Sequence, residues 1–126
     1  MMRPTLVGLL LGCVILFAAC DPGAEITYNN LTGQQLCIYE SERSEPSGIG
    51  QRGCGEVAPE EKQAYLHGPC RGDDPLWIVI TIGPGGEHVY SRLATCGEWD
   101  GETVTIEQRG EQLMVTDSLP SETPSP

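Results

Sequence analysis

The sequence predicts an all-β fold, a small antiparallel β-sandwich of about seven strands that two disulfides stabilise. Three observations lead to this prediction. Short runs of β-forming residues alternate with turns rich in glycine and proline. No stretch after Cys20 has the apolar period of a long helix. Four further cysteines supply covalent links for a modest core, since the whole chain has one phenylalanine and two tryptophans.

The expected strands follow one another at short intervals. They are 25–30, 35–40, 55–58, 62–66, 76–82, 87–93 and 102–108, with 113–115 as a short edge strand. The first two should form a hairpin across the turn at Gly33. Strand 76–82 is nearly all apolar and mostly β-branched, which predicts a central strand covered on much of both faces. The expected arrangement is immunoglobulin-like or transthyretin-like, with a tight corner at 96–101.

Four cysteines allow three disulfide pairings. The glycine-rich turn at 83–86 should fold the chain back on itself and bring Cys70 close to Cys96. Cys37 then pairs with Cys54 across the loop between their own two strands. Closing loops of this length contributes roughly 3 kcal/mol each in the chain-entropy model.

The N-terminus has the composition of an export signal. A basic start at Arg3 is followed by an apolar run that is too short to span a bilayer, and two small residues precede Cys20. A cysteine at this place is typical of bacterial lipoproteins, in which the new N-terminal residue carries lipid chains such as palmitate. Phe17 departs from the usual leucine of that motif. The alternatives are an ordinary secretory signal and an uncleaved N-terminal helix.

The chain therefore divides into four parts. Residues 1–19 are a signal peptide, 20–24 a lipid-anchored tether, 25–115 the β-sandwich domain, and 116–126 a disordered tail rich in serine, threonine and proline. The domain is expected on the extracytoplasmic side of the cell membrane, held there by the lipid on Cys20. An oxidising compartment also favours the two disulfides.

Charge excludes one class of partner. The whole chain has 7 basic and 18 acidic side chains, and Arg3 leaves with the signal, so the mature part has a formal charge of −12. Such a surface repels phosphate backbones, so we expect no nucleic acid partner.

The residues offer little catalytic chemistry. His67 and His88 are the two candidate bases, and neither has a nucleophile motif near it. Both are expected to be solvated polar residues. The sequence therefore predicts a protein that is not an enzyme, with no catalytic residues and no cofactor.

Metal binding is also expected to be absent. Glu98, Asp100 and Glu102 gather three carboxylates, but a calcium loop needs more oxygen ligands at a set spacing. His67 and Cys70 lie near one another without the Cys-x-x-Cys pair of a typical zinc site.

Trp77 and Trp99 are candidates for a binding surface, and we place that surface at Trp99 and Tyr39. Tryptophan is enriched at the centres of protein interfaces. The alternative roles are structural: Trp77 would fill the core and Trp99 would pack the corner.

Several short motifs resemble a loose group of small uncharacterised bacterial β-sandwich lipoproteins. The resemblance covers roughly 26–106 and rests on the segments 29–32, 36–39, 57–60, 89–92 and 99–100. The chain departs from the pattern in its two expected disulfides and in Cys96–Gly97–Glu98 before Trp99. The resemblance implies the sandwich fold and carries no activity.

Two functional hypotheses follow. The first is a non-catalytic, lipid-anchored binding or structural module of the cell envelope that holds a protein or glycan partner. The second is an inhibitor-like or accessory module that inserts the 41–53 loop into a cleft of a protein partner, because a stapled loop loses little entropy on binding.

Overall fold

The computed structural model describes residues 23–42 and 53–120. The expected signal peptide, the lipidation site Cys20, most of the 41–53 loop and the last six residues lie outside these ranges. Within the ranges that are described, no helix is long and apolar enough to cross a membrane.

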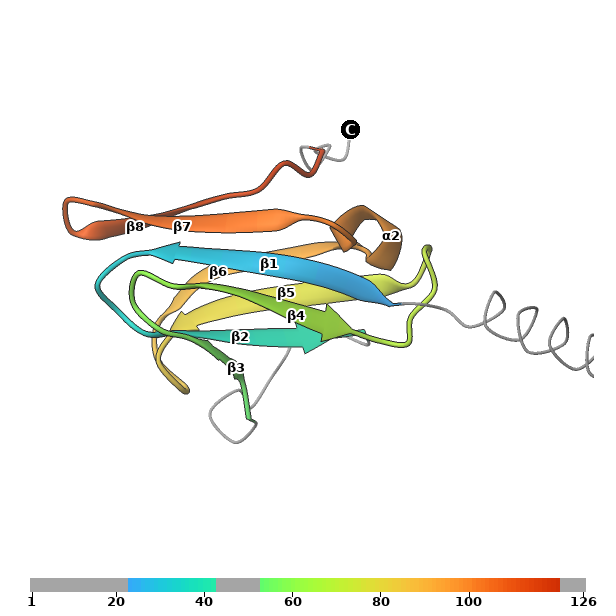
Figure 1. Cartoon of the computed structure of the whole chain (residues 1–126), viewed down its shortest axis with the longest axis horizontal. Coiled ribbons are helices and arrows are strands. Elements are labelled where there is room, and N and C mark those ends of the chain that lie inside the picture. The colour runs from blue at the N-terminus through green and yellow to red at the C-terminus, as the bar shows by residue number, and fades with distance from the viewer. Residues whose placement is uncertain (1–22, 43–52, 121–126) are drawn as a thin grey trace, which may run out of the picture.

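The described part of the chain is mostly β-strand, with one helix of a single turn (Figure 1). The strands run close to the segments that the sequence predicts, with shifts of a residue or two at their ends. In chain order the elements are β1 (Ala24–Leu31), β2 (Leu36–Ser41), β3 (Gly55–Val57), β4 (Lys62–His67), β5 (Pro75–Ile82), β6 (His88–Thr95), α2 (Cys96–Trp99), β7 (Thr103–Arg109) and β8 (Gln112–Thr116).

Two four-stranded sheets enclose the core. The first sheet has the order β4-β1-β7-β8 and the second β3-β2-β5-β6. One pair departs from the expected antiparallel arrangement, because β1 and β7 are parallel. The reason is α2, which receives the chain at the end of β6 and passes it to the first sheet at the end where β1 also begins.

The expected hairpin of the first two strands is wrong. β1 and β2 belong to different sheets, so the turn between them crosses from one sheet to the other. The Asn30 side chain holds this crossing, since its Nδ2 donates to Gln34 O at 2.8 Å and to Val57 O at 3.2 Å. Its Oδ1 accepts from the Thr32 N–H at 3.0 Å and from the Thr32 hydroxyl at 2.6 Å. A buried amide that uses both its donor and its acceptor positions fixes the arch between the layers.

The two ends of the stack differ. At one end β1 begins, β4 ends beside it, and the 68–74 connection and α2 lie close by; we call this the Ala24 end. At the other, the turn end, four short turns join β1 to β2, β3 to β4, β5 to β6 and β7 to β8 (Figure 1).

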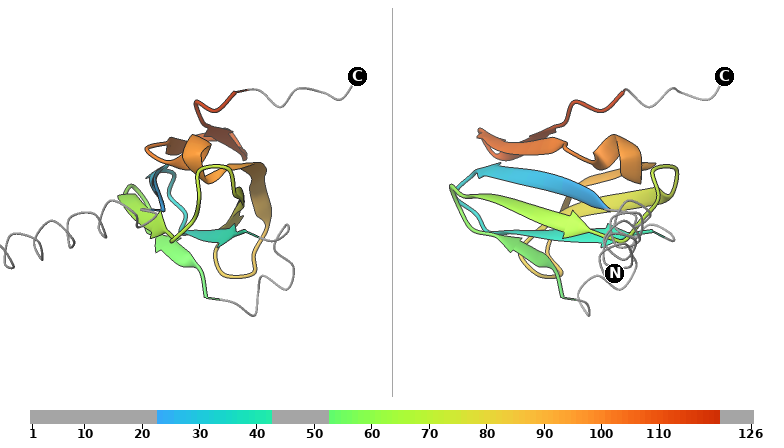
Figure 2. Two further views of the ribbon diagram at one scale, coloured as in Figure 1. Left: turned by 90° about the vertical axis from the view of Figure 1, so that its right-hand side faces the viewer. Right: turned by 45° about the vertical axis from the view of Figure 1, so that its right-hand side comes forward.

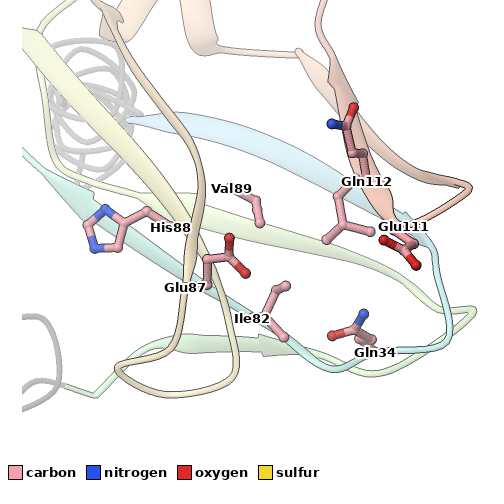
Figure 3. Close-up of a pocket in the computed structure, with 8 residues that line it drawn as sticks. Gln34, Ile82, Glu87, His88, Val89, Glu111 and Gln112 are labelled. Carbon is pink, nitrogen blue, oxygen red and sulfur yellow. The ribbon is translucent and has the colours of Figure 1, made fainter.

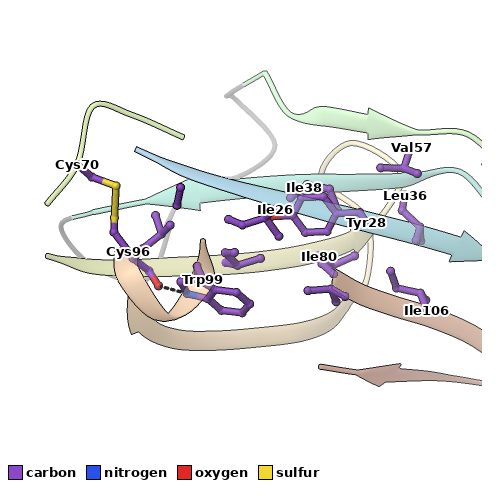
Figure 4. Packing of buried hydrophobic residues seen from close by; sticks show 14 residues of the cluster. Ile26, Tyr28, Leu36, Ile38, Val57, Cys70, Ile80, Cys96, Trp99 and Ile106 are labelled. Carbon is purple, nitrogen blue, oxygen red and sulfur yellow. Dashed lines mark hydrogen bonds between the residues drawn. A yellow bond between two sulfur atoms is a disulfide. The ribbon is translucent and has the colours of Figure 1, made fainter. Parts of the chain in front are cut away.

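The core lies between the sheets, and Trp99 fills it at the Ala24 end (Figure 4). The inward residues of β1, β2, β5 and β7 alternate with outward ones, as the period of two requires. The fully buried side chains of this cluster include Ile26, Tyr28, Leu36, Leu76, Ile78, Ile80, Val104 and Ile106.

Strand β5 is an inner strand that is covered on much of both faces, as the sequence predicts. Ile78 and Ile80 face the main core. On the opposite face Val79 is buried in a second small cluster with Cys37 and Tyr39.

The disulfides join Cys37 to Cys54 and Cys70 to Cys96, the pairing that the turn geometry favours. Pairing of β2 with β3 sets Cys37 opposite Glu56, two residues from Cys54. Pairing of β5 with β6 brings together the segments that carry Cys70 and Cys96. The second disulfide closes the Ala24 end beside Trp99 (Figure 4).

Two expected boundaries change. Ala24, placed in the tether, is the buried first residue of β1. Thr116, placed in the disordered tail, ends β8, and residues 117–120 contact the domain. Composition could not reveal this because the contacts are made by side chains of distant strands.

Candidate functional site

The predicted binding surface at Trp99 and Tyr39 is wrong, because both side chains are buried. Trp99 is 0% exposed, and its indole N–H donates to Leu76 O at 3.0 Å (Figure 4). Tyr39 is 4% exposed, and its hydroxyl accepts from the Gly85 N–H at 3.3 Å. Neither ring can form the centre of an interface in this fold. Trp99 therefore has the corner-packing role that was the alternative.

The other tryptophan has the more exposed position. Trp77 alternates with Leu76 and Ile78, which face the core, so its side chain lies on the outer face of the second sheet. There it is partly exposed and stands opposite Ser41 on β2 and Leu93 on β6. An apolar strand does not reveal which of its faces is the outer one, and the core-filling role considered for Trp77 is not observed.

The three carboxylates considered for calcium serve separate contacts. Glu98 accepts hydrogen bonds from the Thr95 backbone N–H and hydroxyl, both at 3.0 Å, and these bonds hold the pKa of Glu98 below its usual range. Asp100 accepts from the Glu25 N–H at 3.0 Å. Glu102 accepts two hydrogen bonds from the segment that follows β8. Two of these carboxylates thus organise the corner around α2, and the third holds the C-terminal segment.

Cys70, which was considered for zinc together with His67, lies close to two other potential metal ligands. Cys70 Sγ, Cys96 Sγ and a Glu42 carboxylate oxygen lie within 4.8 Å of one another. The two sulfurs form a disulfide, so neither is a thiolate that could hold a metal. Glu42 is instead 3.0 Å from His67 Nε2.

A polar cluster lies at the Ala24 end, where β1, β2 and β4 meet. The Glu40 side chain points inward, and its Oε2 has no hydrogen-bond partner among the described residues. Burial raises the pKa of Glu40 to about 7, although the His67 charge and the nearby Tyr28 hydroxyl act in the opposite direction. The Tyr28 hydroxyl is buried without a partner of ordinary hydrogen-bond geometry, and burial and Glu40 raise its pKa. His67 pairs with Glu42 at the rim of this cluster.

A hollow of about 420 Å³ opens at the turn end (Figure 3). Its wall comes from the turns before β2, β6 and β8 and from the strand residues next to them. The lining residues are Gln34, Ile82, Glu87, His88, Val89, Glu111, Gln112 and Leu113.

The chemistry of the hollow is acidic and amide-rich. Glu87 and Glu111 come from different turns, and Gln34 and Gln112 add side-chain donors and acceptors. The His88 ring points away from the other labelled side chains (Figure 3), so no imidazole is aimed at the two carboxylates. This arrangement can bind a cationic or hydroxyl-bearing group.

Sequence reasoning missed the hollow because its residues are scattered. They come from three separate turns between positions 34 and 113, and only the packing of the two sheets brings them together. The three turns were visible as breaks that contain Gly33, Gly83–Gly86 and Gly110, but nothing in them indicated that they would line one hollow.

Two of these features could serve recognition, the acidic hollow and the Trp77 face. The hollow is concave and built from several elements, which is typical of ligand sites. The Trp77 face is one partly exposed ring on a sheet surface. The chain has no significant match among protein-family models, among curated proteins or among solved structures, so its function must be inferred from this geometry and chemistry.

Proposed function

We propose that the protein is a lipid-anchored, extracytoplasmic, non-catalytic binding module of the cell envelope. The lipid on Cys20 holds it to the membrane, and the acidic hollow receives a group of a protein or glycan partner. One observation carries the proposal: the hollow lies at the end of the stack opposite to the expected anchor.

The anchor is close to the domain in sequence. Three residues separate Cys20 from Ala24, which is already buried in β1. A chain of that length spans at most about 14 Å when fully extended. The Ala24 end would therefore stand next to the headgroups.

The hollow points the other way. β1 has eight residues and rises by about 23 Å from Ala24 to Leu31, where the turn end begins. Gln34 follows directly in that turn and lines the hollow. A partner in the envelope would meet this end first.

The charge distribution fits the same orientation. The mature chain is strongly acidic, so it gains nothing from lying flat on an anionic membrane. Glu87 and Glu111 would attract ammonium, guanidinium or hydroxyl groups and repel phosphates. Peptide and glycan chains bear such groups.

A non-catalytic role is supported by the state of the two histidines. His67 is paired with Glu42, and the His88 ring points away from the hollow. A general base must reach the proton that it removes. Neither imidazole ring is positioned to remove a proton from a group bound in the hollow.

The finer fold assignment belongs to the proposal as well. We infer an immunoglobulin-like or transthyretin-like sandwich from the two facing sheets and the crossing between them. The likeness to small bacterial β-sandwich lipoproteins is compatible with this assignment, and it carries no activity.

The anchor and the site are tested separately. Cells supplied with labelled palmitate should give a labelled protein, and Cys20→Ser should abolish the label. An unlabelled wild-type protein would contradict the anchor. The position of the hollow opposite Cys20 would then no longer support a role in binding partners.

The site is tested by crosslinking and capture from envelope extracts. The double variant Glu87→Gln/Glu111→Gln should lose most of the captured partner. The control is Glu61→Gln, which removes one exposed carboxylate from another turn at the same end. Equal capture by all three proteins would reject the hollow as the site.

The alternative is the inhibitor-like module that uses the 41–53 loop. It is favoured by the Cys37–Cys54 disulfide, which ties one end of the loop to β2. Replacing 44–52 by a glycine-serine segment should then abolish capture, and the Glu87/Glu111 variant should retain it.

A further inference from the structure

The edge strands β6 and β8 face one another on one side of the two-sheet stack. They belong to different sheets, and the left view of Figure 2 shows them side by side. We call the boundary between these two edge strands the seam. The acidic hollow is the seam's opening at the turn end. Further along, the chain's own residues 117–120, which we call the strap, fill the seam.

Asp117 is the main contact of the strap. Its Oδ2 accepts from the Tyr90 hydroxyl at 2.6 Å, and its Oδ1 accepts from Arg92 Nη1 at 2.9 Å. The carboxylate is 7% exposed and the Arg92 side chain 17%. Burial, together with the hydrogen bond to Asp117, raises the pKa of the Tyr90 hydroxyl. The inner face of β6 thus forms a carboxylate site with one cation and one hydroxyl donor.

The next two residues extend the recognition. Ser118 donates from its N–H, at 2.8 Å, and from its hydroxyl, at 2.5 Å, to Glu102 Oε1. Leu119 packs against the main core. Asp117 and Leu119 are half-buried while Ser118 and Pro120 are exposed, the alternation of an extended peptide. Along the strap, the domain therefore contacts a carboxylate, a hydroxyl and a leucine side chain in succession.

The strap leaves one buried polar group of the seam without a hydrogen-bond partner. Arg92 Nη2 donates to the Pro120 carbonyl, but the buried Arg92 Nε has no acceptor among the described residues. A buried N–H without an acceptor is unfavourable, and guanidinium groups prefer two parallel bonds to one carboxylate. The strap also lies outside any strand, so few backbone bonds oppose its release.

We propose that the seam is a peptide-recognition groove, and that the strap occupies it as an internal substitute for a partner. The partner is a protein segment that presents a carboxylate to Arg92 and Tyr90, a hydroxyl to Glu102, and a leucine-sized side chain to the core. Such a segment displaces the strap and supplies the acceptor that Arg92 Nε lacks. This groove is separate from the cationic chemistry proposed for the hollow.

The test uses the complete mature chain, with strap variants and a labelled probe. The probe is an acetylated fluorescent peptide with the sequence of residues 116–120. The double variant Asp117→Asn/Leu119→Ser weakens the strap and leaves the groove intact. Fluorescence anisotropy should show the probe binding to it at least tenfold more tightly than to the wild-type chain, whose strap competes at high effective concentration.

Matched controls separate recognition from loosening. Asp73→Asn removes an exposed carboxylate elsewhere and should bind the probe no better than the wild type. Adding Arg92→Gln to the strap variant should reduce probe binding at least tenfold. A probe with asparagine in place of aspartate should lose binding to the same degree.

Three results would overturn the proposal. One is a folded strap variant that does not bind millimolar probe. Another is equal binding of the aspartate and asparagine probes. The third is concentration-dependent dimers of the strap variant in place of probe capture, which would assign the groove to a second copy of the chain. If the double variant does not fold, Asp117→Asn alone is measured against the same probe and the same outcomes apply.

Discussion

The Ala24 end and the turn end of the stack are built on different principles. At the Ala24 end, a disulfide, a buried tryptophan and a capped helical turn hold the chain through long-range contacts. At the turn end, the strands are joined by short turns, and the space between β6 and β8 is left open as the acidic hollow.

This difference separates stability from recognition. The closely tied end is the one expected to stand next to the membrane, and the open end points toward partners. A rigid scaffold that carries its binding groups on connecting segments is a common arrangement in proteins. Substitutions at the two ends should therefore affect different measurements.

The largest effect is expected for Trp99→Ala. The side chain is fully buried and satisfies its N–H with Leu76 O, so its removal leaves a large cavity and an unpaired carbonyl. The loss should be about 3–5 kcal/mol, a large part of the stability of a small domain. Urea unfolding followed by fluorescence measures it, and Trp77→Ala is the control, with a smaller loss. Equal losses would show that the buried Trp99 contributes no more to stability than the partly exposed Trp77.

The next effect is expected for Cys70→Ala/Cys96→Ala. The disulfide closes a separation of 26 residues, for which the chain-entropy model gives roughly 3 kcal/mol. Thermal unfolding of the double variant should show this loss, while the hollow keeps its partner. Loss of partner capture by a folded variant would show that the two ends are coupled.

A pH-dependent effect should come from Glu40. Its folded pKa of about 7 lies above the usual value of 4.5, so the folded state favours the protonated carboxyl. The resulting stability is complete below pH 4.5 and is lost as the pH rises through 7, by at most about 3 kcal/mol. Glu40→Gln should remove this part of the pH dependence of urea unfolding and be more stable than the wild type at pH 8.5.

Other ionisable groups lie near Glu40, so the experiment needs a control that separates their titration from that of Glu40. Tyr28 faces it from β1 and His67 from β4, and Glu42, which follows directly after β2, pairs with His67. His67→Gln should be measured in parallel, because a pH profile that flattens only in this variant would assign the titration to histidine.

The smallest effect on stability is expected at the turn end. Glu87→Gln and Glu111→Gln change surface groups for which the structure gives no hydrogen bond within the described residues, so each should change the free energy of unfolding by less than about 0.5 kcal/mol. The same variants should have the largest effect on partner capture. A stability loss comparable to that of Trp99→Ala would mean that the hollow is a structural element.

Local pattern was sufficient for much of the fold. Alternation predicted the strands, the continuous apolar run at 76–82 predicted an inner strand, and the turn at 83–86 predicted the disulfide pairing. These predictions succeed because each depends on neighbours in sequence or on a single turn.

Predictions that required knowing which sheet a strand joins were less successful. The expected hairpin of β1 and β2 is a crossing between sheets, since the Asn30 amide bonds to residues almost thirty positions away. Trp99 and Tyr39 are the predicted binding surface because aromatic residues are enriched at interfaces, but the fold buries both. The two faces of a strand look alike in sequence until the opposing sheet is known.

The amino-acid sequence by itself determined the strands, the turns, the cysteine pairing and the strong negative charge, because short-range propensity, loop geometry and composition set them. It also carries the expected anchor at Cys20, which the described residues do not include. Only the tertiary structure decided the parallel pairing of β1 with β7, the burial of Trp99 and the outward position of Trp77, the hollow at the turn end and the strap in the seam. Each of these depends on contacts between residues distant in the chain, and such contacts exist only once the two sheets have packed together.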